Sequence, residues 1–234
     1  MDAKNLNEQN EKMDYFVDVI HHLKTPFNHI KGLATLLEKS RTLTPEQVTY
    51  IELIKASAQS GLEMTTNLLD LNSHEINSSI KTELVELDNF VGDRILQFNP
   101  IALVKNIGFT INIEAKSICT DKGYLATIFD NLTCNAIKFS PADSTIGIQV
   151  IQSIEGIKIS IKDQGPGFTE HDKTYLYHRF KKLSANPTGG ETSNGLGLAI
   201  VKQLVDKLDG NIELNSIAGQ GSEFIVTIPS HSIR

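Results

Sequence analysis

Two adjacent histidines stand shortly before a proline in the segment IHHLKTP, which runs from Ile20 to Pro26. The unperturbed pKa of an imidazole is about 6.5, so an exposed His21 or His22 is largely neutral and nucleophilic at neutral pH. Such a ring can accept a phosphoryl group. On this segment alone, a solvated helix face that happens to carry two histidines is the preferred interpretation, and phosphoryl chemistry requires a donor elsewhere in the chain.

The segment DNLTCNAIKFS places two amides and an ammonium group on one face of a predicted helix. Asn131, Asn135 and Lys138 recur at spacings of four and three residues. Amide oxygens suit magnesium and a lysine suits phosphate, so this face fits a magnesium–phosphate cluster. A polar surface face is the alternative, but the apolar Leu132 and Ala136 predict that the other side of this helix is buried.

A turn with two glycines follows a predicted strand in the segment KDQGPGF. Asp163 ends the strand, and Gly165 and Gly167 let the backbone turn sharply and approach a ligand closely. A carboxylate in this place can accept a hydrogen bond from an exocyclic amine such as that of adenine. An ordinary loop remains the alternative, because two glycines alone do not define a site.

A second glycine segment leads directly into an amphipathic helix. Gly195, Leu196 and Gly197 precede or begin that helix, whose free N–H groups would form an anion site that glycines allow a ligand to approach. No Gly-Lys-Ser/Thr follows, so this is not a P-loop.

A long segment of weak periodicity separates the two glycine segments. It holds 27 residues between Gly167 and Gly195, and loops of this length in compact domains are usually functional, often as lids. We expect Phe180 to anchor this loop, and Lys181 and Lys182 to reach toward phosphates.

The first part of the chain, to about Ile76, has a helical period and no strand alternation. Its first apolar stripe occupies heptad a and d positions: Phe16, Val19, Leu23, Ile30, Leu33 and Leu37, with Pro26 in the same seam and Ile20, Phe27 and Ala34 along one flank. A second stripe follows: Val48, Ile51, Ile54, Ala58, Leu62, Thr65 and Leu69. Thr44 and Gln47, around Pro45, form a capping box that predicts where the second helix begins. The sequence thus predicts a hairpin of two helices of about 30 residues, or ~45 Å, each. The stripes are wider than one seam, which favours dimerisation into a four-helix bundle.

The heptad register also predicts how the two histidines are presented. His21 falls at position f, which points away from the bundle core, and His22 falls at position g, at its shoulder. Pro26 lacks an N–H group and crowds the carbonyl of His22, so the helix should bend there. His21 is therefore predicted to be accessible to a partner molecule.

From about Thr82 the pattern changes to mixed helices and strands. The predicted strands are 82–87, 108–114, the two halves of 145–163 around a turn at Glu155 and Gly156, 211–216 and 222–228. The predicted helices begin at caps on Asp88 and Asp121 and at Gly197. Together these elements predict an α/β sandwich of about 150 residues.

Composition excludes several classes of function. A net charge of −6 without a dense basic stripe argues against nucleic-acid binding. The apolar runs are short and the first residues are polar, so neither a membrane-spanning helix nor a secretory signal is predicted. Cys119 and Cys134 are too few for a disulfide framework or a zinc site. We expect a cytoplasmic segment without membrane contact.

From about Tyr15 to Pro229 the chain resembles the catalytic core of bacterial sensor histidine kinases. The family's phosphoacceptor box, Ser-His-Glu-Leu-Arg-Thr-Pro, reads Ile-His-His-Leu-Lys-Thr-Pro here. Its Asn, first glycine, phenylalanine and second glycine boxes follow in order as NLTCNAIKFS, DQGPGF, LYHRFKK and NGLGLAIVKQLV, and GQGSEFIVTIP resembles its last segment. The resemblance implies an α+β protein. Residues 1–80 would form a dimerisation and histidine-phosphotransfer domain, and residues 81–234 an ATP-binding domain of the Bergerat (GHKL) type.

The resemblance also implies catalytic roles. His21 would be the phosphoacceptor, and Thr25 matches the position that orients water when such kinases dephosphorylate their partner. Asn131 stands where gyrase-like ATPases carry a glutamate that activates water. Because asparagine cannot act as a base, this position favours transfer to another acceptor over hydrolysis.

The other boxes are implied to bind ATP and Mg²⁺. Asn135 would be the main magnesium ligand, with Asn131 beside it. The further nucleotide contacts would be Lys138, Asp163, Gly165, Gly167, Phe180, Lys182, Gly195, Leu196 and Gly197. The phosphoryl group would then pass from His21 to an aspartate of a response-regulator receiver domain.

His22 departs from the family pattern, which places Glu or Asp after the acceptor to orient its ring and take its proton. A neutral imidazole can accept a proton, whereas a protonated one would repel the charge that forms on His21. The sequence therefore also allows an ATP-binding dimeric module that acts mainly as a phosphatase or phosphotransfer platform, with weak or no autokinase activity. A gyrase-like ATP hydrolase ranks lower, because it leaves the helical hairpin unexplained.

Overall fold

In a computed structural model, the chain divides into two compact units, Met1–Ser78 and Ser79–Arg234. The structure describes residues 24–25, 27–38, 43–44, 46–48, 50–51, 54–55, 58, 61, 65, 80–189 and 195–230. Within these ranges, no helix has the length and apolar character needed to cross a membrane.

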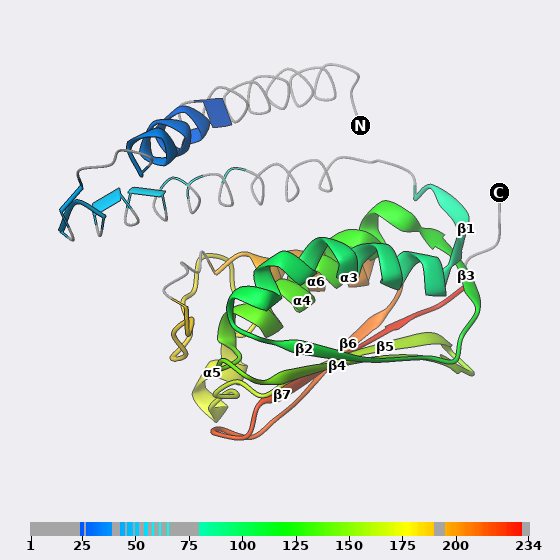
Figure 1. Ribbon diagram of the computed structural model, residues 1–234. Coiled ribbons are helices and arrows are strands. Elements are labelled where there is room, and N and C mark those ends of the chain that lie inside the picture. The colour runs from blue at the N-terminus through cyan, green and yellow to red at the C-terminus, as the bar shows by residue number, and fades with distance from the viewer. Residues whose placement is uncertain are drawn as a thin grey trace, which may run out of the picture. The chain divides into compact units, whose positions relative to one another are not determined.

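The first unit has helical residues between 24 and 38 and again from residue 46 onward (Figure 1). The amide of Gln47 donates to Thr44 Oγ1 (3.2 Å), and the amide of Thr44 donates to Gln47 Oε1 (2.8 Å). This reciprocal pair satisfies two backbone donors at the start of the second helix, so the predicted capping box is confirmed.

The hairpin buries only part of each predicted apolar stripe. Ala34 on the first helix and Ile51, Ala58 and Thr65 on the second, at heptad spacing, are at most 5% exposed. A Cβ atom on Gly61 would collide with the ring of Phe27, so small residues permit this close approach. The larger seam residues remain between 37% and 62% exposed: Ile30, Leu33, Leu37, Val48 and Ile54. The remaining residues of the predicted stripes lie outside the described residues: Phe16, Val19, Ile20, Leu23, Pro26, Leu62 and Leu69.

The second unit combines a two-stranded and a five-stranded sheet, and helices cover one face of the larger sheet (Figure 1). Its elements are β1 Thr82–Glu86, α3 Leu87–Val104, β2 Gly108–Ile113, β3 Ser117–Asp121, α4 Lys122–Phe139, β4 Thr145–Ser153, β5 Gly156–Asp163, α5 Glu170–Thr174, α6 Gly197–Lys207, β6 Asn211–Ser216 and β7 Ser222–Ile228. The large sheet has the order β2-β4-β5-β7-β6. In it β2 is parallel to β4 and the other neighbours are antiparallel, and β1 pairs antiparallel with β3. The predicted α+β fold class is confirmed.

The core lies between this sheet and the helices. Alternate strand residues point toward α4 and α6 and are at most 4% exposed: Ile146, Ile148, Val150, Ile157, Ile159, Ile161, Phe224, Val226 and Ile228. From α4 the matching apolar residues are Leu125, Ile128, Phe129, Leu132 and Ala136. Each Val, Leu, Ile or Phe side chain among them contributes about 1.5–3 kcal/mol when fully buried. This burial fixes α4 on the sheet and leaves its polar face, with Asn131 and Asn135, at the margin of the core.

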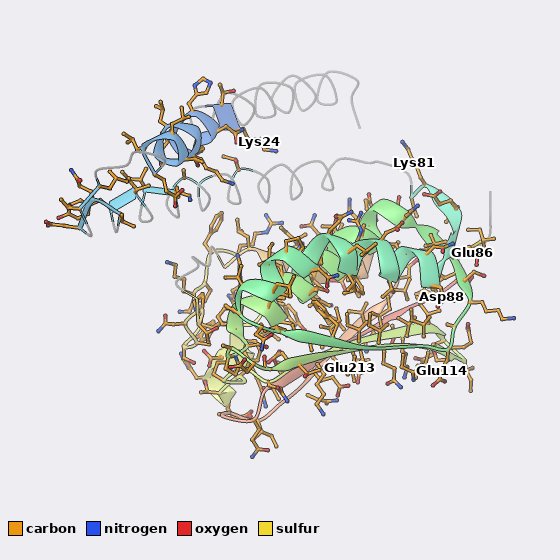
Figure 2. All side chains as sticks on the ribbon, in the orientation of Figure 1. Lys24, Lys81, Glu86, Asp88, Glu114 and Glu213 are labelled. Atoms are coloured by element: carbon orange, nitrogen blue, oxygen red, sulfur yellow. The ribbon has the colours of Figure 1, made fainter. Side chains whose placement is uncertain are left out.

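Two helix starts were predicted from a single aspartate each, and one prediction is wrong. Asp121 Oδ1 accepts hydrogen bonds from the amides of Gly123 and Tyr124, both at 3.0 Å, so it caps α4 as predicted. The N-cap of α3 is Glu86 rather than Asp88, and the Glu86 side chain makes no capping hydrogen bond. Figure 2 shows both acids at the start of α3. Asp88 lies in the first turn, where its negative charge still interacts favourably with the helix dipole.

Candidate functional site

The polar face of α4 meets the start of α6. A Cβ atom on Gly197, the first residue of α6, would lie 2.8 Å from Asn131 Oδ1 and 3.8 Å from Asn135 Nδ2. Only a glycine allows these amides to come so near the helix start without displacement. The segments around Asn131 and around Gly197, which the sequence predicted separately, therefore lie in contact and form one candidate site.

The orientation of the Asn131 amide is fixed by the backbone of its own helix. Its Nδ2 donates to Thr127 O at 2.8 Å, so Oδ1 is the atom that faces Gly197. An amide oxygen so presented suits a hard cation such as Mg²⁺. In the described part of the chain, no group of three or more His, Cys, Asp or Glu side chains could hold a metal ion. A metal here would therefore depend on amide oxygens together with those of a bound phosphate chain, and the residues fit that role.

Asp163 lies at the end of β5 and is 7% exposed. Its Oδ1 accepts from the amides of Gly165 (2.8 Å) and Ser222 (3.3 Å), and its Oδ2 accepts from the Ser222 hydroxyl. Burial raises the pKa of this carboxyl, while the bonds from Ser222 and Gly165 oppose that shift. The carboxylate is thus held rigidly, with acceptor capacity left for a ligand amine.

The sequence prediction missed Ser222, although it follows Gly221 in the glycine-rich segment GQGS. Gly221 has a φ of +88°, and a Cβ atom there would collide with Asp163 O. The signal that could have found Ser222 is therefore the pair of glycines before it, which predict a close backbone approach.

The first glycine segment packs between α4 and the turn that joins β6 to β7. A Cβ atom on Gly165 would lie 2.9 Å from Phe139 O, at the end of α4. Gly167 has a φ of +65°, and a Cβ atom there would collide with Ile217 O. These approaches bring Asp163 to the same end of the unit as the last turn of α4.

The phenylalanine segment pairs with the second glycine segment. Phe180 N donates to Gly195 O at 2.9 Å, and a Cβ atom on Gly195 would lie 2.6 Å from Lys181 O. The Phe180 ring is 53% exposed, so backbone contacts rather than burial of this ring hold the loop here. Lys181 Nζ lies 4.6 Å from the centroid of the Tyr175 ring, whereas the neighbouring Lys182 is exposed.

Asp172 fastens the same loop to α5, and the sequence prediction missed it. The amide and hydroxyl of Ser184 donate to its two carboxylate oxygens at 2.8 and 2.5 Å, and Thr169 completes a capping box with it. Burial alone would raise the pKa of Asp172, but the hydrogen bonds from Ser184 and Thr169 outweigh it and hold the pKa well below its usual range. The ionised Asp172 side chain thereby joins α5 to the part of the long loop that holds Ser184.

The remaining predicted residues are placed as follows. Leu196 is fully buried at the start of α6, and Lys138 is half-buried in the last turn of α4. Thr25 is helical and exposed in the first unit. His21 and His22 lie outside the described residues, so their roles stay predictions.

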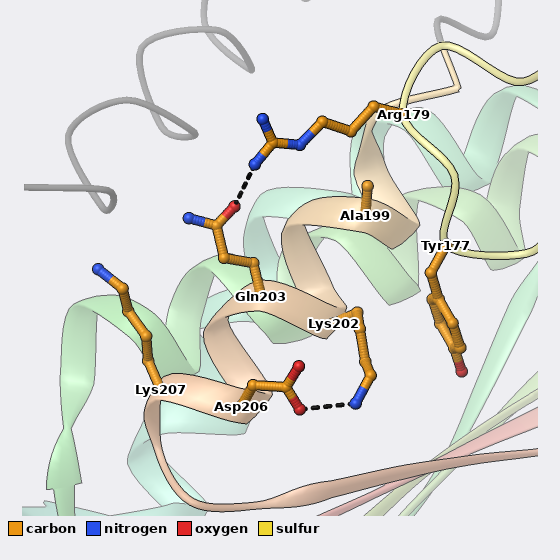
Figure 3. A pocket seen from close by; sticks show the side chains of 7 residues that line it. All are labelled: Tyr177, Arg179, Ala199, Lys202, Gln203, Asp206 and Lys207. Atoms are coloured by element: carbon orange, nitrogen blue, oxygen red, sulfur yellow. Dashed lines mark hydrogen bonds and ion pairs between the residues drawn. The ribbon is translucent and has the colours of Figure 1, made fainter.

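An open groove of about 480 Å³ runs along α6 (Figure 3). It is lined by Tyr177, Arg179, Ala199, Lys202, Gln203, Asp206 and Lys207. Lys202 Nζ pairs with Asp206 Oδ1 at 2.6 Å, and burial together with the Asp206 charge raises the pKa of Tyr177 to about 12. None of the residues predicted to bind nucleotide lines this groove, so it is distinct from the site between α4 and α6.

Two family models match the chain. Residues 12–77 match the His Kinase A (phospho-acceptor) domain, and residues 120–232 match the histidine kinase-, DNA gyrase B- and HSP90-like ATPase. This chain belongs to the histidine kinases. The predicted family resemblance is therefore confirmed, and the site between α4 and α6 lies within the ATPase match of this histidine kinase core.

Curated relatives agree with that assignment. The sensor histidine kinase GacS of Pseudomonas protegens is 29% identical over 226 residues, which cover 93% of this chain and 24% of that protein. The sensor protein kinase WalK of Staphylococcus aureus is 27% identical over 234 residues, which cover 96% of this chain and 55% of that protein. The histidine kinase core thus spans about a quarter of the first relative.

Solved structures share the fold. Full-length ShkA, in complex with AMPPNP, aligns with a TM-score of 0.69 at 24% identity over 94% of this chain and 47% of that one. The Acinetobacter baumannii histidine kinase AdeS aligns with a TM-score of 0.63 at 20% identity over 91% of this chain and 98% of that one.

Proposed function

We propose that this histidine kinase core moves the γ-phosphoryl group of ATP to His21, and then to an aspartate of a response-regulator receiver domain. The observation that carries the proposal is the meeting of Asn131 Oδ1 and Asn135 with Gly197. It supports one site in which a phosphate chain and its cation lie between α4 and the start of α6.

In this proposal, one set of residues binds the adenine base and another set binds the phosphates. Asp163 accepts a hydrogen bond from the adenine amine, and the first glycine segment, with Gly165 and Gly167, lets the base approach it. Asn135, assisted by Asn131, holds Mg²⁺, which when bound neutralises charge on the phosphates. The other phosphate contacts are Lys138, Lys182, the backbone of Gly195, Leu196 and Gly197, and the segment around Phe180.

The transfer step needs no protein base at Asn131. A neutral ring nitrogen of His21 attacks the γ-phosphorus in line, and the bond to the β,γ-bridging oxygen breaks, so the electron pair leaves with ADP. His22, in its neutral form, takes the proton that His21 loses. We therefore expect autophosphorylation to fall more steeply on acidification than in kinases with a carboxylate at this place.

The helical unit is proposed to dimerise. Five large apolar residues of its seam are exposed in a single chain, and burying them against a second copy would complete a four-helix bundle. We propose the domain boundary near residue 80, with the phosphotransfer domain at 1–80 and the ATP-binding domain at 81–234, both in the cytoplasm, where ATP is available.

The experiment is incubation of the full chain with γ-labelled ATP and magnesium. We expect label that is acid-labile and alkali-stable, absent from H21Q and retained in H22Q, where it should form more slowly because glutamine cannot take the proton from His21. The presence of His22 in place of the family's acidic residue favours a second candidate function. In it the chain is a phosphatase or phosphotransfer platform that uses Thr25 to orient water. Absence of label from a chain that binds ATP would reject the autokinase and support that second function.

A further inference from the structure

Lys105 ends α3, and its ammonium group reaches the last turn of α4. Its Nζ donates to the main-chain oxygens of Ile137 and Lys138 and to Thr188 Oγ1, each at 2.9 Å. Three acceptors match the three N–H groups of an ammonium ion. Lys105 therefore acts on protein groups and has no donor left for a phosphate.

Thr188 belongs to the long loop between the two glycine segments, and it is bonded to the same turn of α4. Its amide donates to Lys138 O (3.0 Å), and its hydroxyl donates to Ser140 O (2.5 Å). Lys138 is a proposed phosphate contact, and Asn135 stands one turn earlier on the same helix. The loop and the phosphate-binding face of α4 thus share one set of hydrogen bonds, with Lys105 at its centre.

The position of Lys105 is itself well determined. Asp143 N donates to Lys105 O at 2.9 Å, and Asn106 Nδ2 donates to Asp143 Oδ1 at 2.7 Å. The ammonium charge also lies at the C-terminus of α4, where a cation is favoured by the helix dipole. Its geometry is therefore imposed by the fold and does not depend on a ligand.

We propose that Lys105 is a positioning residue for nucleotide binding: it joins Thr188 to the last turn of α4 and so sets the loop against the phosphate-binding face. This proposal rests on the proposed ATP site. Lys105 touches no substrate group, and it acts through the backbone of Lys138 and through Thr188.

The test compares T188V with T188S and K105M with K122M, in the full chain. Valine removes the hydroxyl at nearly constant volume, serine keeps it, and Lys122 is an exposed lysine at the opposite end of α4. We expect K105M to weaken Mg-ATP binding about tenfold and T188V about threefold to fivefold, measured as a rise in the dissociation constant by equilibrium titration. In the autophosphorylation assay the same losses should appear as a rise in KM with little change in kcat. T188S and K122M should bind ATP like the wild type, and K105M combined with T188V should be no weaker than K105M alone.

A second readout does not depend on ATP. In nucleotide-free protein, K105M should speed hydrogen exchange at the Thr188 amide, and K122M should leave it unchanged. Unchanged exchange in K105M, wild-type affinity in T188V, or fully additive effects in the double variant would each overturn the proposal. Failure of the wild type to label His21 would count against the proposed kinase reaction alone, because exchange and ATP affinity are measured without transfer.

Discussion

Replacing Gly197 with alanine tests the meeting of α4 and α6 most directly. Alanine is a better helix residue than glycine, so the start of α6 should not suffer. The added methyl group would lie 2.8 Å from Asn131 Oδ1, whereas ordinary van der Waals contact begins at 3.4 Å. The amide oxygen must therefore retreat by roughly 0.6 Å, the difference between these two distances, from the place where a ligand would meet it.

This displacement of Asn131 Oδ1 should weaken the binding of ATP. A misplacement of about 1 Å in a positioned group can cost on the order of 100-fold in rate. For roughly 0.6 Å we expect about a tenfold loss of Mg-ATP affinity, or ~1.4 kcal/mol. The hydrogen bond from Asn131 Nδ2 to Thr127 O, at 2.8 Å, opposes rotation of the amide and so prevents easy relief.

The assay is isothermal titration of G197A with Mg-ATP, paired with its thermal midpoint. The matched control is G92A, a glycine within α3 whose added Cβ would meet nothing within 4 Å. G92A should gain about 0.5–1 kcal/mol of stability and bind ATP normally. Wild-type ATP affinity in G197A would refute the reasoning, because it would mean that Asn131 Oδ1 does not mark the ligand position.

Two further predictions follow from pKa shifts. The folded-state pKa of Asp172 is lowered, so the stability it contributes is present above about pH 4 and is lost as the pH falls further. D172N should lower the urea midpoint at pH 7 and reduce the additional loss of stability below pH 4, and an acid sensitivity equal to that of the wild type would contradict this. The pKa of Tyr177 is raised to about 12, so near-ultraviolet titration should show a late phenolate transition that Y177F lacks. A late transition that persists in Y177F would show that the Tyr177 phenol is not its source.

The sequence predicted well those features that depend on neighbours along the chain. The capping box of Thr44 and Gln47 and the cap at Asp121 were found because each involves residues within three positions of one another. The shared face of Asn131 and Asn135 follows from helix periodicity in the same way.

The features that the sequence did not predict depend on contacts between distant segments. Strand β3 has five residues, with no turn signal to mark it, and becomes a strand by pairing with β1. Ser222 approaches Asp163 only after β5 and β7 pair, and Lys105 finds Thr188 only after α3 and α4 pack. No local pattern of residue types carries such information, because these polar partners are chosen by tertiary geometry.

Helix α4 is held at both ends by charges that come from outside it. At its start, Asp121 accepts from two amides of the first turn and also from Lys81 N at 3.0 Å, and at its end Lys105 binds the carbonyls of Ile137 and Lys138. A helix closed in this way resists fraying, so its length is constant. In the proposed ATP site, α4 therefore keeps Asn131 at a constant distance from its last turn, against which Gly165 packs beside Asp163, and this distance would limit the length of nucleotide that fits between Asn131 and Asp163. Adaptation to a different ligand would have to come from its loops.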